Sequence, residues 1–455
     1  MLRREEIEEL RSIVGAEWVS TGDSVRKLHS RDESFHESVL PDVVVWPHST
    51  EEVSRLLKWA YRRKIPITPW GAGTSLEGNP IPVRGGMVIS LQEMNRILAI
   101  RQEDFQVDVQ AGINYKELNR QLSRYGLFFP PDPGADATIG GMIGNNASGI
   151  RTVKYGATKD YVMRLVVVLP DGEIIQTGTR ARKSSSGYDL CRLFTGSEGT
   201  LGIITEATLR LVGLPANFMA LRATFPTLRA ATDTVFQIMS SGLTPSAMEF
   251  LDEEVVRVIN IDRGLSLQEN PTLLMEFDGF SKKGLQEEIA FVEEICRGNG
   301  CSSLDKGIGP EERNRLWEIR HLTFESIKRC HPGLSPLIVD VAVPLSRYSD
   351  MVAFIKQAVA DLNAYIFGHA GDGNIHVVIM DDPGDERRWE QVQRANEKIV
   401  LKALELEGTC TGEHGVGIGK RGFLPREHGK SLKLMKRIKE LLDPEGLMNP
   451  EKIFL

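Results

Sequence analysis

Two glycine-rich segments in the first third of the chain constrain its fold more than any other feature. They read PWGAGTSLEG (69–78) and PPDPGADATIGGMIGNNASG (130–149). Glycine lacks a Cβ atom, so its backbone N–H group can approach a phosphate closely, and clusters of Gly with Ser, Thr and Asn suit a pyrophosphate-binding loop. Either segment alone could be a simple turn. Two of them in one domain favour a pyrophosphate cradle, and the Gly, Pro and Asn content of 130–149 argues against a helix or a central strand there.

The size and charge of the chain exclude several classes of protein. With 455 residues, two or three domains are expected, and a net charge of −7 gives no reason to expect nucleic acid as a partner. No apolar run approaches the roughly 20 residues of a membrane-spanning helix. The first residues, MLRREEIEELRSIVG, have apolar positions at helical spacing instead of a signal-peptide core. We therefore expect a cytoplasmic protein, or one peripheral to a membrane.

The cysteines contain no Cys-x-x-Cys pair, so neither an iron–sulfur cluster nor a zinc ribbon is expected. Their odd number argues against a disulfide framework, and they are interpreted as reduced thiols. They are Cys191, Cys296, Cys301, Cys330 and Cys410.

The pattern of apolar residues predicts an α+β protein with a domain boundary near 213–217. Ser49 and Glu52 form a capping box that predicts a helix over 49–64. Strands are expected at 87–91, 105–112 and 161–178, where Asp171-Gly172 marks a hairpin turn. Beyond the boundary, helices are predicted over 227–241, 281–297, 310–329 and 346–362.

The segment GHAGDGNIH (368–376) carries two of the nine histidines of the chain on either side of turn-forming residues. The flanking segments 363–367 and 375–380 are typical of strands, so a β-hairpin is predicted. If Asp372-Gly373 forms a two-residue loop, His369 lies directly opposite His376 on one face of the sheet, and both rings could bind one ion. The alternative is an ordinary turn with two incidental polar residues.

A dinucleotide-type glycine pattern occurs once more, as GIGKRG (417–422). It has no preceding strand and no acidic residue about 20 positions later in a βαβ unit. We interpret this pattern as unrelated to dinucleotide binding. A solvated loop is an equally good interpretation of this segment.

Seven segments, spread in order over nearly the whole chain, match the sequence motifs of a known family. They resemble the FAD-linked D-2-hydroxyacid dehydrogenases of the vanillyl-alcohol-oxidase type, above all the cytochrome-type D-lactate dehydrogenases and the glycolate oxidase flavin subunit. They are PDVVVWPHSTEEV (41–53), PWGAGTSLEG (69–78), PDPGADATIGGMIGNNASG (131–149), TGSEGTLGIITEATLRL (195–211), GHAGDGNIH (368–376), TGEHGVG (411–417) and LDPEGLMNPEKIF (442–454).

The resemblance implies an α+β fold with a two-subdomain FAD-binding domain of PCMH type. The implied division is an N-terminal helical segment at 1–38, the FAD domain at 39–214, a substrate or cap domain with a metal site at 215–425, and a C-terminal segment at 426–455 that packs on the FAD domain. Relatives that attach FAD covalently use a histidine in the first glycine loop, and 69–78 has none, so the resemblance implies non-covalent FAD. The implied FAD-binding residues are Pro69, Gly71, Ala72, Gly73, Thr74, Ser75, Leu76, Pro133, Gly134, Gly140, Gly141, Asn145, Ser148, Gly149, Glu198, Gly199, Gly202, Ile204 and Asn449.

The resemblance also implies a divalent metal ion held by His369, His376 and Glu413. Two imidazoles and one carboxylate suit zinc, manganese or iron, and the sequence does not choose among them. A second Glu-His-Gly, beginning at Glu427, lacks flanking glycines and is expected at the surface.

The implied reaction is the oxidation of a D-2-hydroxy acid by hydride transfer to flavin N5. A bound cation would make the substrate hydroxyl more acidic, His414 is the candidate base, and Arg320 the candidate clamp for the substrate carboxylate. Relatives that act on D-2-hydroxyglutarate use a lysine in the strand before a D-x-x-x-P motif and an asparagine two positions after the second metal histidine. Here that strand, 335–344, has no lysine, and Val378 occupies the second position. D-Lactate is therefore the expected substrate, and Val378 either lines the pocket or packs against the sheet.

Other functions remain open at the level of sequence. A glycolate oxidase flavin subunit and a D-2-hydroxyglutarate dehydrogenase are the alternatives within the family. A flavin-dependent alcohol or sugar oxidase on the same scaffold would have no need of the His369, His376 and Glu413 set. An electron-transfer or flavin-storage subunit would not be reduced by a hydroxy acid. A dehydrogenase would pass its electrons to an external cytochrome, quinone, electron-transfer flavoprotein or iron–sulfur subunit.

Overall fold

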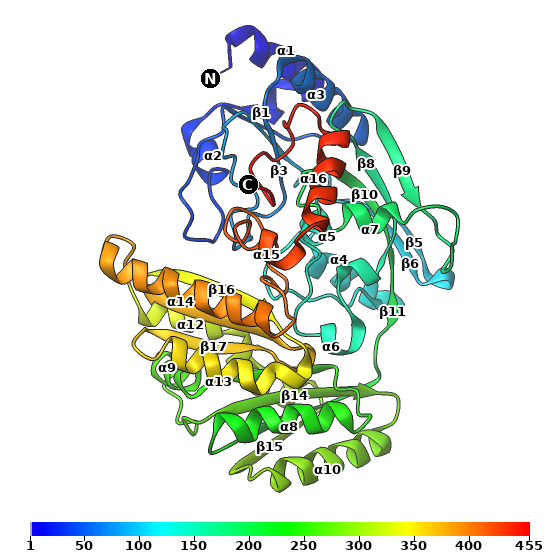
Figure 1. Ribbon diagram of the computed structural model, residues 1–455. Coiled ribbons are helices and arrows are strands. Elements are labelled where there is room, and N and C mark those ends of the chain that lie inside the picture. Colours follow the sequence, from blue (N-terminus) through cyan, green and yellow to red (C-terminus); the bar gives the residue numbers. More distant parts are fainter. Residues whose placement is uncertain (1) are drawn as a thin grey trace. The chain divides into compact units, whose positions relative to one another are not determined.

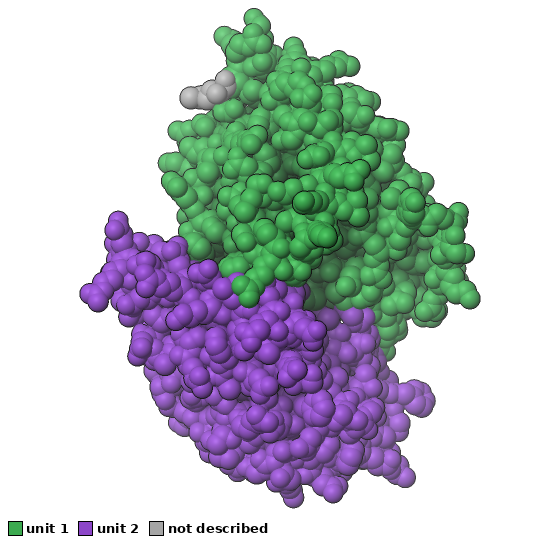
Figure 2. Space-filling view, in the orientation of Figure 1, with its two compact units in different colours: residues 1–148, 157–214, 413–455 green, residues 149–156, 215–412 purple. Residues whose placement is uncertain are grey.

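The computed structural model describes residues 2–455, which fall into two compact units (Figures 1 and 2). Unit 1 contains residues 1–148, 157–214 and 413–455, and unit 2 contains 149–156 and 215–412. The expected boundary near 213–217 therefore falls at 214/215. The last part of unit 1 begins at residue 413, not at 426, and the short segment 149–156 belongs to unit 2.

Unit 1 contains two sheets, as expected for a two-subdomain flavin domain. The first has the order β1-β2-β4-β3, with parallel β2/β4 and β3/β4 pairs. The second is antiparallel, with the order β5-β6-β10-β8-β9. Their strands are β1 (Val19–Ser20), β2 (Val43–Val45), β3 (Ile67–Trp70), β4 (Met87–Ser90), β5 (Ile97–Arg101), β6 (Gln106–Gln110), β8 (Val162–Val168), β9 (Ile174–Gly178) and β10 (Ile203–Arg210), and a separate pair is formed by β7 (Leu127–Phe128) and β11 (Val212–Gly213).

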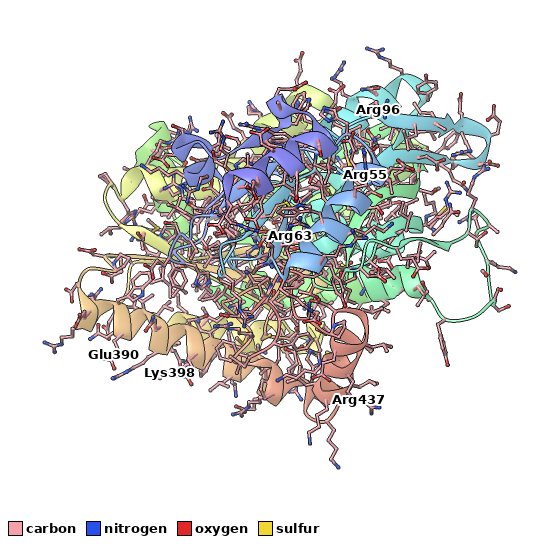
Figure 3. All side chains as sticks on the ribbon, turned by 90° about the horizontal axis from the view of Figure 1, so that it is seen from above. Arg55, Arg63, Arg96, Glu390, Lys398 and Arg437 are labelled. Carbon is pink, nitrogen blue, oxygen red and sulfur yellow. The ribbon has the colours of Figure 1, made fainter. Side chains whose placement is uncertain are left out.

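One helix of unit 1 lies where 49–64 was predicted, with only half of the expected capping box, because the Glu52 carboxylate accepts from the N–H of His48 and not from that of Ser49. Helix α3 (Thr50–Arg63) begins after Ser49, whose hydroxyl accepts from the backbone N–H of Glu52 at 3.2 Å. Its apolar face is buried in a core shared with α1 and both sheets. Arg55 and Arg63 of this helix, labelled in Figure 3, are exposed and half-buried, respectively. The other helices are α1 (Arg4–Val14), α2 (Asp23–Leu28), α4 (Tyr115–Leu122), α5 (Ile139–Asn145), α7 (Leu190–Phe194), α15 (Leu424–His428) and α16 (Ser431–Leu442).

Unit 2 is built on one seven-stranded sheet with the order β15-β12-β14-β13-β17-β18-β16, in which every pair is antiparallel. The strands are β12 (Asn217–Thr224), β13 (Ala247–Leu251), β14 (Thr272–Gly279), β15 (Ser303–Ile308), β16 (Ser335–Ala342), β17 (Ala364–His369) and β18 (Asn374–Asp381).

Helices cover both faces of this sheet (Figure 1). Helices α8 (Leu228–Ser240), α10 (Lys282–Gly298), α13 (Tyr348–Ala358) and α14 (Glu386–Glu405) pack side by side on one face. On the other face, α9 (Glu253–Arg263), α11 (Pro310–His321) and α12 (Thr323–Cys330) share a core cluster with β13, β14, β17 and β18, and the short α6 (Thr152–Tyr155) contacts β13. Glu390 and Lys398 project outward from α14 (Figure 3), opposite its buried residues.

One predicted helix is divided. The segment 310–329 forms α11 and α12, which are separated by Leu322. The single-helix prediction was wrong because the second half starts a new helix whose residues Thr323, Ser326 and Ile327 are buried at helical spacing.

Among residues 2–455, no helix combines the length and the apolar character needed to cross a bilayer. All five cysteines are free thiols, as predicted, and burial raises the pKa of Cys191 to about 11 and of Cys296 to about 12.

Candidate functional site

The two glycine-rich segments lie next to each other in unit 1. The first segment leaves β3 at Trp70 and approaches the start of α5. A Cβ atom on Gly71 would lie 2.5 Å from Oγ1 of Thr138, and one on Gly140 would lie 2.8 Å from Cβ of Ala111. Neither position has room for a side chain, so glycine lets these segments pack closely against their neighbours.

The second segment contains a helix, which corrects the sequence interpretation. Helix α5 runs from Ile139 to Asn145, and the Thr138 hydroxyl at its N-cap accepts from the N–H of Gly141 at 3.3 Å. The prediction against a helix weighed the unfavourable propensity of Gly and Asn. Burial of Ile139, Met142 and Ile143 at positions i, i+3 and i+4 outweighs that propensity.

These segments line a cleft that lies entirely within unit 1. The volume of the cleft, including the part that is open to solvent, is about 1200 Å³. All of the expected FAD-binding residues line it except Gly134, Ser148 and Gly149, and Gly149 belongs to unit 2. Lining residues that the sequence reasoning did not name include Trp70, Asn79, Leu91, Ala111, Thr138 and Gly144. Glycine backbone that lines the cleft, beside small and polar side chains, fits a dinucleotide such as FAD.

Glu198 and Asn449 line this cleft and also fix the C-terminal segment. The buried Glu198 carboxylate accepts from the N–H groups of Val416 and Gly417, at 2.6 and 2.9 Å. Burial raises the pKa of this carboxyl, and the hydrogen bonds oppose that shift. The Asn449 amide donates to the carbonyls of Asn79 and Glu198, at 3.0 and 2.7 Å. Both side chains therefore form hydrogen bonds with backbone groups of neighbouring segments.

The glycine pattern at 417–422 packs against the flavin-domain fold. The N–H of Ile418 donates to the carbonyl of Glu77 at 2.8 Å, and the Lys420 side chain is only 2% exposed. Gly417 and Lys420 are buried and Gly422 is exposed, so the segment is held against unit 1 and only its end resembles a solvated loop. These contacts are also the reason why unit 1 resumes at residue 413.

The histidine segment forms a β-hairpin in unit 2, but its register differs from the prediction. Phe367, not His369, lies opposite His376. The connection is longer than two residues because Ala370–Asp372 form a turn of 3₁₀ helix and Asp372 accepts from the N–H of Asn374. The shift is by two positions, which leaves every side chain on its predicted face. The rings of His369 and His376 still lie 5.1 Å apart, centroid to centroid, and both residues are buried.

His369 contacts a buried carboxylate on the neighbouring strand. Glu249 is its direct partner between β13 and β17, and Oε1 of Glu249 lies 2.6 Å from Nδ1 of His369. Oε2 of Glu249 accepts from Nε of Arg320 at 2.5 Å. Arg320 is 12% exposed and its guanidinium lies 5.1 Å from the ring centroid of Phe367, so the structure places the predicted arginine and histidine around one acid.

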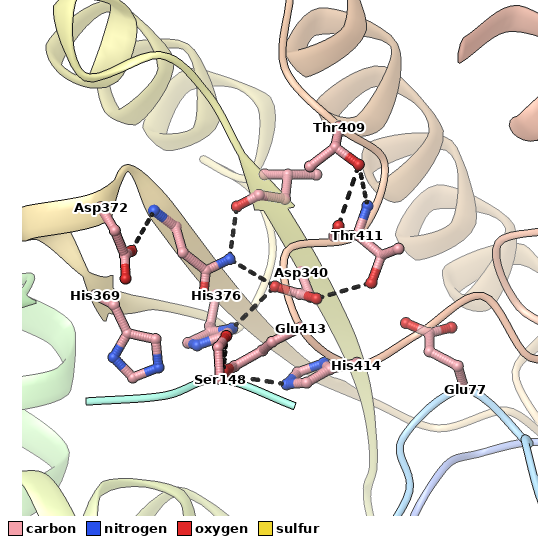
Figure 4. Close-up of polar contacts among 12 residues, drawn as sticks. Glu77, Ser148, Asp340, His369, Asp372, His376, Thr409, Thr411, Glu413 and His414 are labelled. Carbon is pink, nitrogen blue, oxygen red and sulfur yellow. Dashed lines mark hydrogen bonds and ion pairs between the residues drawn. The ribbon is translucent and has the colours of Figure 1, made fainter. Parts of the chain in front are cut away.

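His376 has an acid of its own. Asp340 of β16 is its direct strand partner, with Oδ1 of Asp340 3.6 Å from Nδ1 of His376 (Figure 4). The Asp340 carboxylate accepts from Asn374 at 2.7 Å and from Thr411 at 3.0 Å. Thr409 bonds to the carbonyl of Ala342, so the last residues of unit 2 are fastened to β16.

Glu413 and His414 follow Gly412, the last residue of unit 2, directly in the chain and are assigned to unit 1. There, Ser148 donates to Oε2 of Glu413 at 2.9 Å, and both Glu413 and His414 line the cleft. Asn145 donates to the backbone carbonyl of His414 at 3.2 Å. In the second Glu-His-Gly, Gly429 is exposed while Glu427 and His428 are partly exposed, so the structure places that sequence at the surface, as expected.

Sequence reasoning missed Glu249 and did not single out Asp340. Each is a fully buried acid in an otherwise apolar strand, AMEFL and SPLIVDVA. A charged residue in such a strand is the signal that could have found them, because a buried acid requires a partner.

Val378 is fully buried and belongs to the core cluster formed with α9, α11 and α12. The structure therefore gives the second of the two readings left open for it, packing against the sheet.

Known proteins resemble the chain over almost all of its length. Residues 41–178 match the model of an FAD binding domain, and residues 214–453 match the C-terminal domain of FAD linked oxidases. The chain is 43% identical to D-lactate dehydrogenase [cytochrome], mitochondrial, of Arabidopsis thaliana over 99% of its own length and 80% of that protein. The chain belongs to the FAD-linked oxidases.

A second relative of this FAD-linked oxidase is glycolate oxidase subunit GlcD of Bacillus subtilis (strain 168), at 37% identity over 100% of the chain and 97% of that protein. Among solved structures, p-cresol methylhydroxylase with substrate bound superimposes with a TM-score of 0.79 at 15% identity, covering 99% of this chain and 96% of that one. At that identity the likeness shows the fold, which is of PCMH type, as expected.

Proposed function

We propose that this FAD-linked oxidase is an FAD-dependent dehydrogenase that oxidises a D-2-hydroxy monocarboxylate, D-lactate above others, to the 2-oxo acid. The observation that carries the proposal is the group His369, His376 and Arg320, which β17, β18 and α11 hold on one face of the unit 2 sheet. Two imidazoles and a guanidinium meet the needs of a hydroxy acid, a cation near its hydroxyl and a clamp for its carboxylate.

A divalent metal ion is part of the proposal, with His369, His376 and Glu413 as its ligands. The donor set suits zinc, manganese or iron, and each histidine lies beside a buried acid, a common arrangement for metal-binding imidazoles. Glu413 follows immediately after the segment that Thr409 and Thr411 fasten to β16. When bound, the ion would polarise the substrate hydroxyl.

His414 is proposed as the base that accepts the hydroxyl proton, and Arg320 as the group that binds the carboxylate. An imidazole titrates near neutral pH, and a planar guanidinium can grip a carboxylate through two N–H groups. FAD in the unit 1 cleft would accept the hydride from the substrate Cα. Since 69–78 contains no histidine, FAD should be held without a covalent bond. An external electron acceptor would then be needed to reoxidise the cofactor.

The test uses the FAD-loaded protein under anaerobic conditions. D-Lactate should bleach the flavin, and His376→Ala should lose the divalent metal and bleaching together while it retains FAD, because the cleft lies in unit 1. His428→Ala, from the second Glu-His-Gly, should behave like the unmodified protein. Bleaching that persists after verified removal of all metal would refute the metal role, and absence of bleaching by any 2-hydroxy acid would favour an electron-transfer or storage function.

A second candidate within the family is glycolate oxidation, favoured by the 37% identity to glycolate oxidase subunit GlcD. Glycolate in the same anaerobic assay distinguishes the two.

A further inference from the structure

Glu249 is a buried acid with two partners, an imidazole and a guanidinium, and both partners belong to the proposed substrate site. Its side chain has no exposed surface, and each carboxylate oxygen has a separate partner: Oε1 contacts Nδ1 of His369 at 2.6 Å, and Oε2 contacts Nε of Arg320 at 2.5 Å. One acid therefore fixes two side chains that lie on different elements, β17 and α11.

The contact with His369 determines how that ring can act. A carboxylate accepts, so the ring must donate from Nδ1. A neutral imidazole with its proton on Nδ1 has its lone pair on Nε2, which is then the ligand atom for a cation. The negative charge beside the ring also makes the imidazole a better electron donor.

The contact with Arg320 determines which N–H groups of that side chain remain available for a substrate. Glu249 takes the Nε edge of the guanidinium, and the face of the guanidinium lies over the ring of Phe367. A guanidinium has five N–H donors, so a carboxylate of the substrate would be bound through the remaining Nη groups. The orientation of Arg320 is set from two sides before any substrate is present.

A second arginine–glutamate pair on the same helix shows what a purely structural contact looks like. Arg313 lies seven residues before Arg320 on α11, and its Nε pairs with Glu276 of β14, which is 1% exposed. The Glu276 carboxylate has Ser246 nearby, at 3.4 Å, where Glu249 has a histidine. The two pairs are alike in burial and location, and only Glu249 connects to the histidine hairpin.

We propose that Glu249 is a positioning residue that sets the tautomer of His369 for metal binding and the orientation of Arg320 for carboxylate binding. This inference rests on the proposed function, since it assigns Glu249 a part in the same site. It predicts that a single change at Glu249 weakens both metal binding and substrate binding. A change at Arg320 should weaken substrate binding alone.

The experiment measures zinc affinity of the metal-stripped, FAD-loaded protein by competition with a chromophoric chelator, without substrate. Glu249→Gln should lower zinc affinity by about 10- to 100-fold, the range found when carboxylates behind metal-binding histidines are changed. It should also raise KM for D-lactate. Arg320→Lys should raise KM alone and leave zinc affinity unchanged. Glu276→Gln is the matched control and should alter neither.

Glu249→Asp keeps the buried charge and serves if Glu249→Gln does not fold. The shorter side chain should not reach both partners, so zinc affinity or KM should still change relative to Glu276→Gln. The inference is overturned if a folded Glu249 variant binds zinc and D-lactate as the Glu276→Gln control does. If instead the unmodified protein takes up no divalent ion and D-lactate does not bleach its flavin, the proposed function itself fails.

Discussion

Lys452 is a lysine with only 2% of its surface exposed, and its ammonium group donates to the carbonyl of Ile81. Burial lowers its pKa to about 8, although the nearby Glu198 and Asp32 oppose the shift. Below pH 8 the side chain is charged in both the folded and the unfolded chain. Between pH 8 and its ordinary value of 10.5 the folded chain has released the proton and the unfolded chain still binds it. Stability therefore rises through this window, by about 3 kcal/mol for this one group.

The prediction is that the free energy of unfolding of the unmodified protein gains about 3 kcal/mol between pH 8 and 10.5 relative to Lys452→Met, which cannot titrate there. Urea unfolding at several pH values measures both curves. Lys430→Met, at an exposed position, should run parallel to the unmodified protein. If Lys452→Met also runs parallel, the lysine is not desolvated as described.

Individual residues were predicted where the backbone imposes a local rule. The glycines of 69–78 and 140–141 and the histidines around the 368–376 turn stand out in the sequence because few residues can replace them. Glu249 did not stand out, because its partners lie 71 and 120 residues away and only the folded sheet brings them together.

At the scale of elements, local signals found α3, the hairpin of β8 and β9, α8 and α10. Helices α9 and α14 were not predicted, although Asp252 and Asp385 cap them and their buried positions recur at helical spacing. The His369–His376 hairpin was predicted with a register that is wrong by two positions. The sequence did not reveal the 3₁₀ turn at 370–372, which makes the connection longer than the two residues assumed.

The C-terminal segment is held to unit 1 as an added piece of sheet, with Asn449 at its centre. Ile67 of β3 pairs with Met448 in parallel, and the N–H of Asn449 donates to the carbonyl of Ile67 at 2.7 Å. The side-chain amide then donates to two further carbonyls, those of Asn79 and Glu198. Asn449 has φ of +39°, a conformation that Asn and Asp tolerate better than most residues.

Asn449→Asp keeps the shape and the backbone preference and replaces the amide donor with an acceptor that faces two carbonyls. We expect a loss of at least about 2 kcal/mol in the free energy of unfolding, because buried acceptors are left without a donor. FAD should also bind less tightly, since Asn79, Glu198 and Asn449 all line the cleft. Thermal unfolding and flavin titration measure the two effects. Asn95→Asp, on the surface, is the control, and a variant no weaker than this control would contradict the anchoring role.

For the whole molecule, motifs spread along the chain predicted the fold class. The sequence did not predict which short segments belong to each unit. Residues 149–156 join unit 2 and residues 413–425 join unit 1. Such exchanges of short segments depend on contacts such as Lys154 with Asp278 and Glu198 with Gly417, which the sequence does not display.

The last prediction concerns which hydroxy acid the molecule prefers. D-2-Hydroxyglutarate has a second carboxylate, and burying it without a cation costs several kcal/mol. Strand β16 has the sequence SPLIVDVA, without lysine or arginine. Arg320 can serve the first carboxylate, and β16 supplies no cation for the second. D-Lactate should therefore be preferred, with glycolate next, because glycolate lacks the methyl group, and D-2-hydroxyglutarate poor.

Comparing kcat/KM for D-lactate, glycolate, D-2-hydroxybutyrate and D-2-hydroxyglutarate decides this order. The comparison isolates the tail of the substrate, since all four share the hydroxyl and the first carboxylate. D-2-Hydroxybutyrate tests whether a slightly longer apolar tail is accepted. A tenfold preference for D-2-hydroxyglutarate, about 1.4 kcal/mol of transition-state binding, would mean that a cation outside β16 neutralises the second carboxylate.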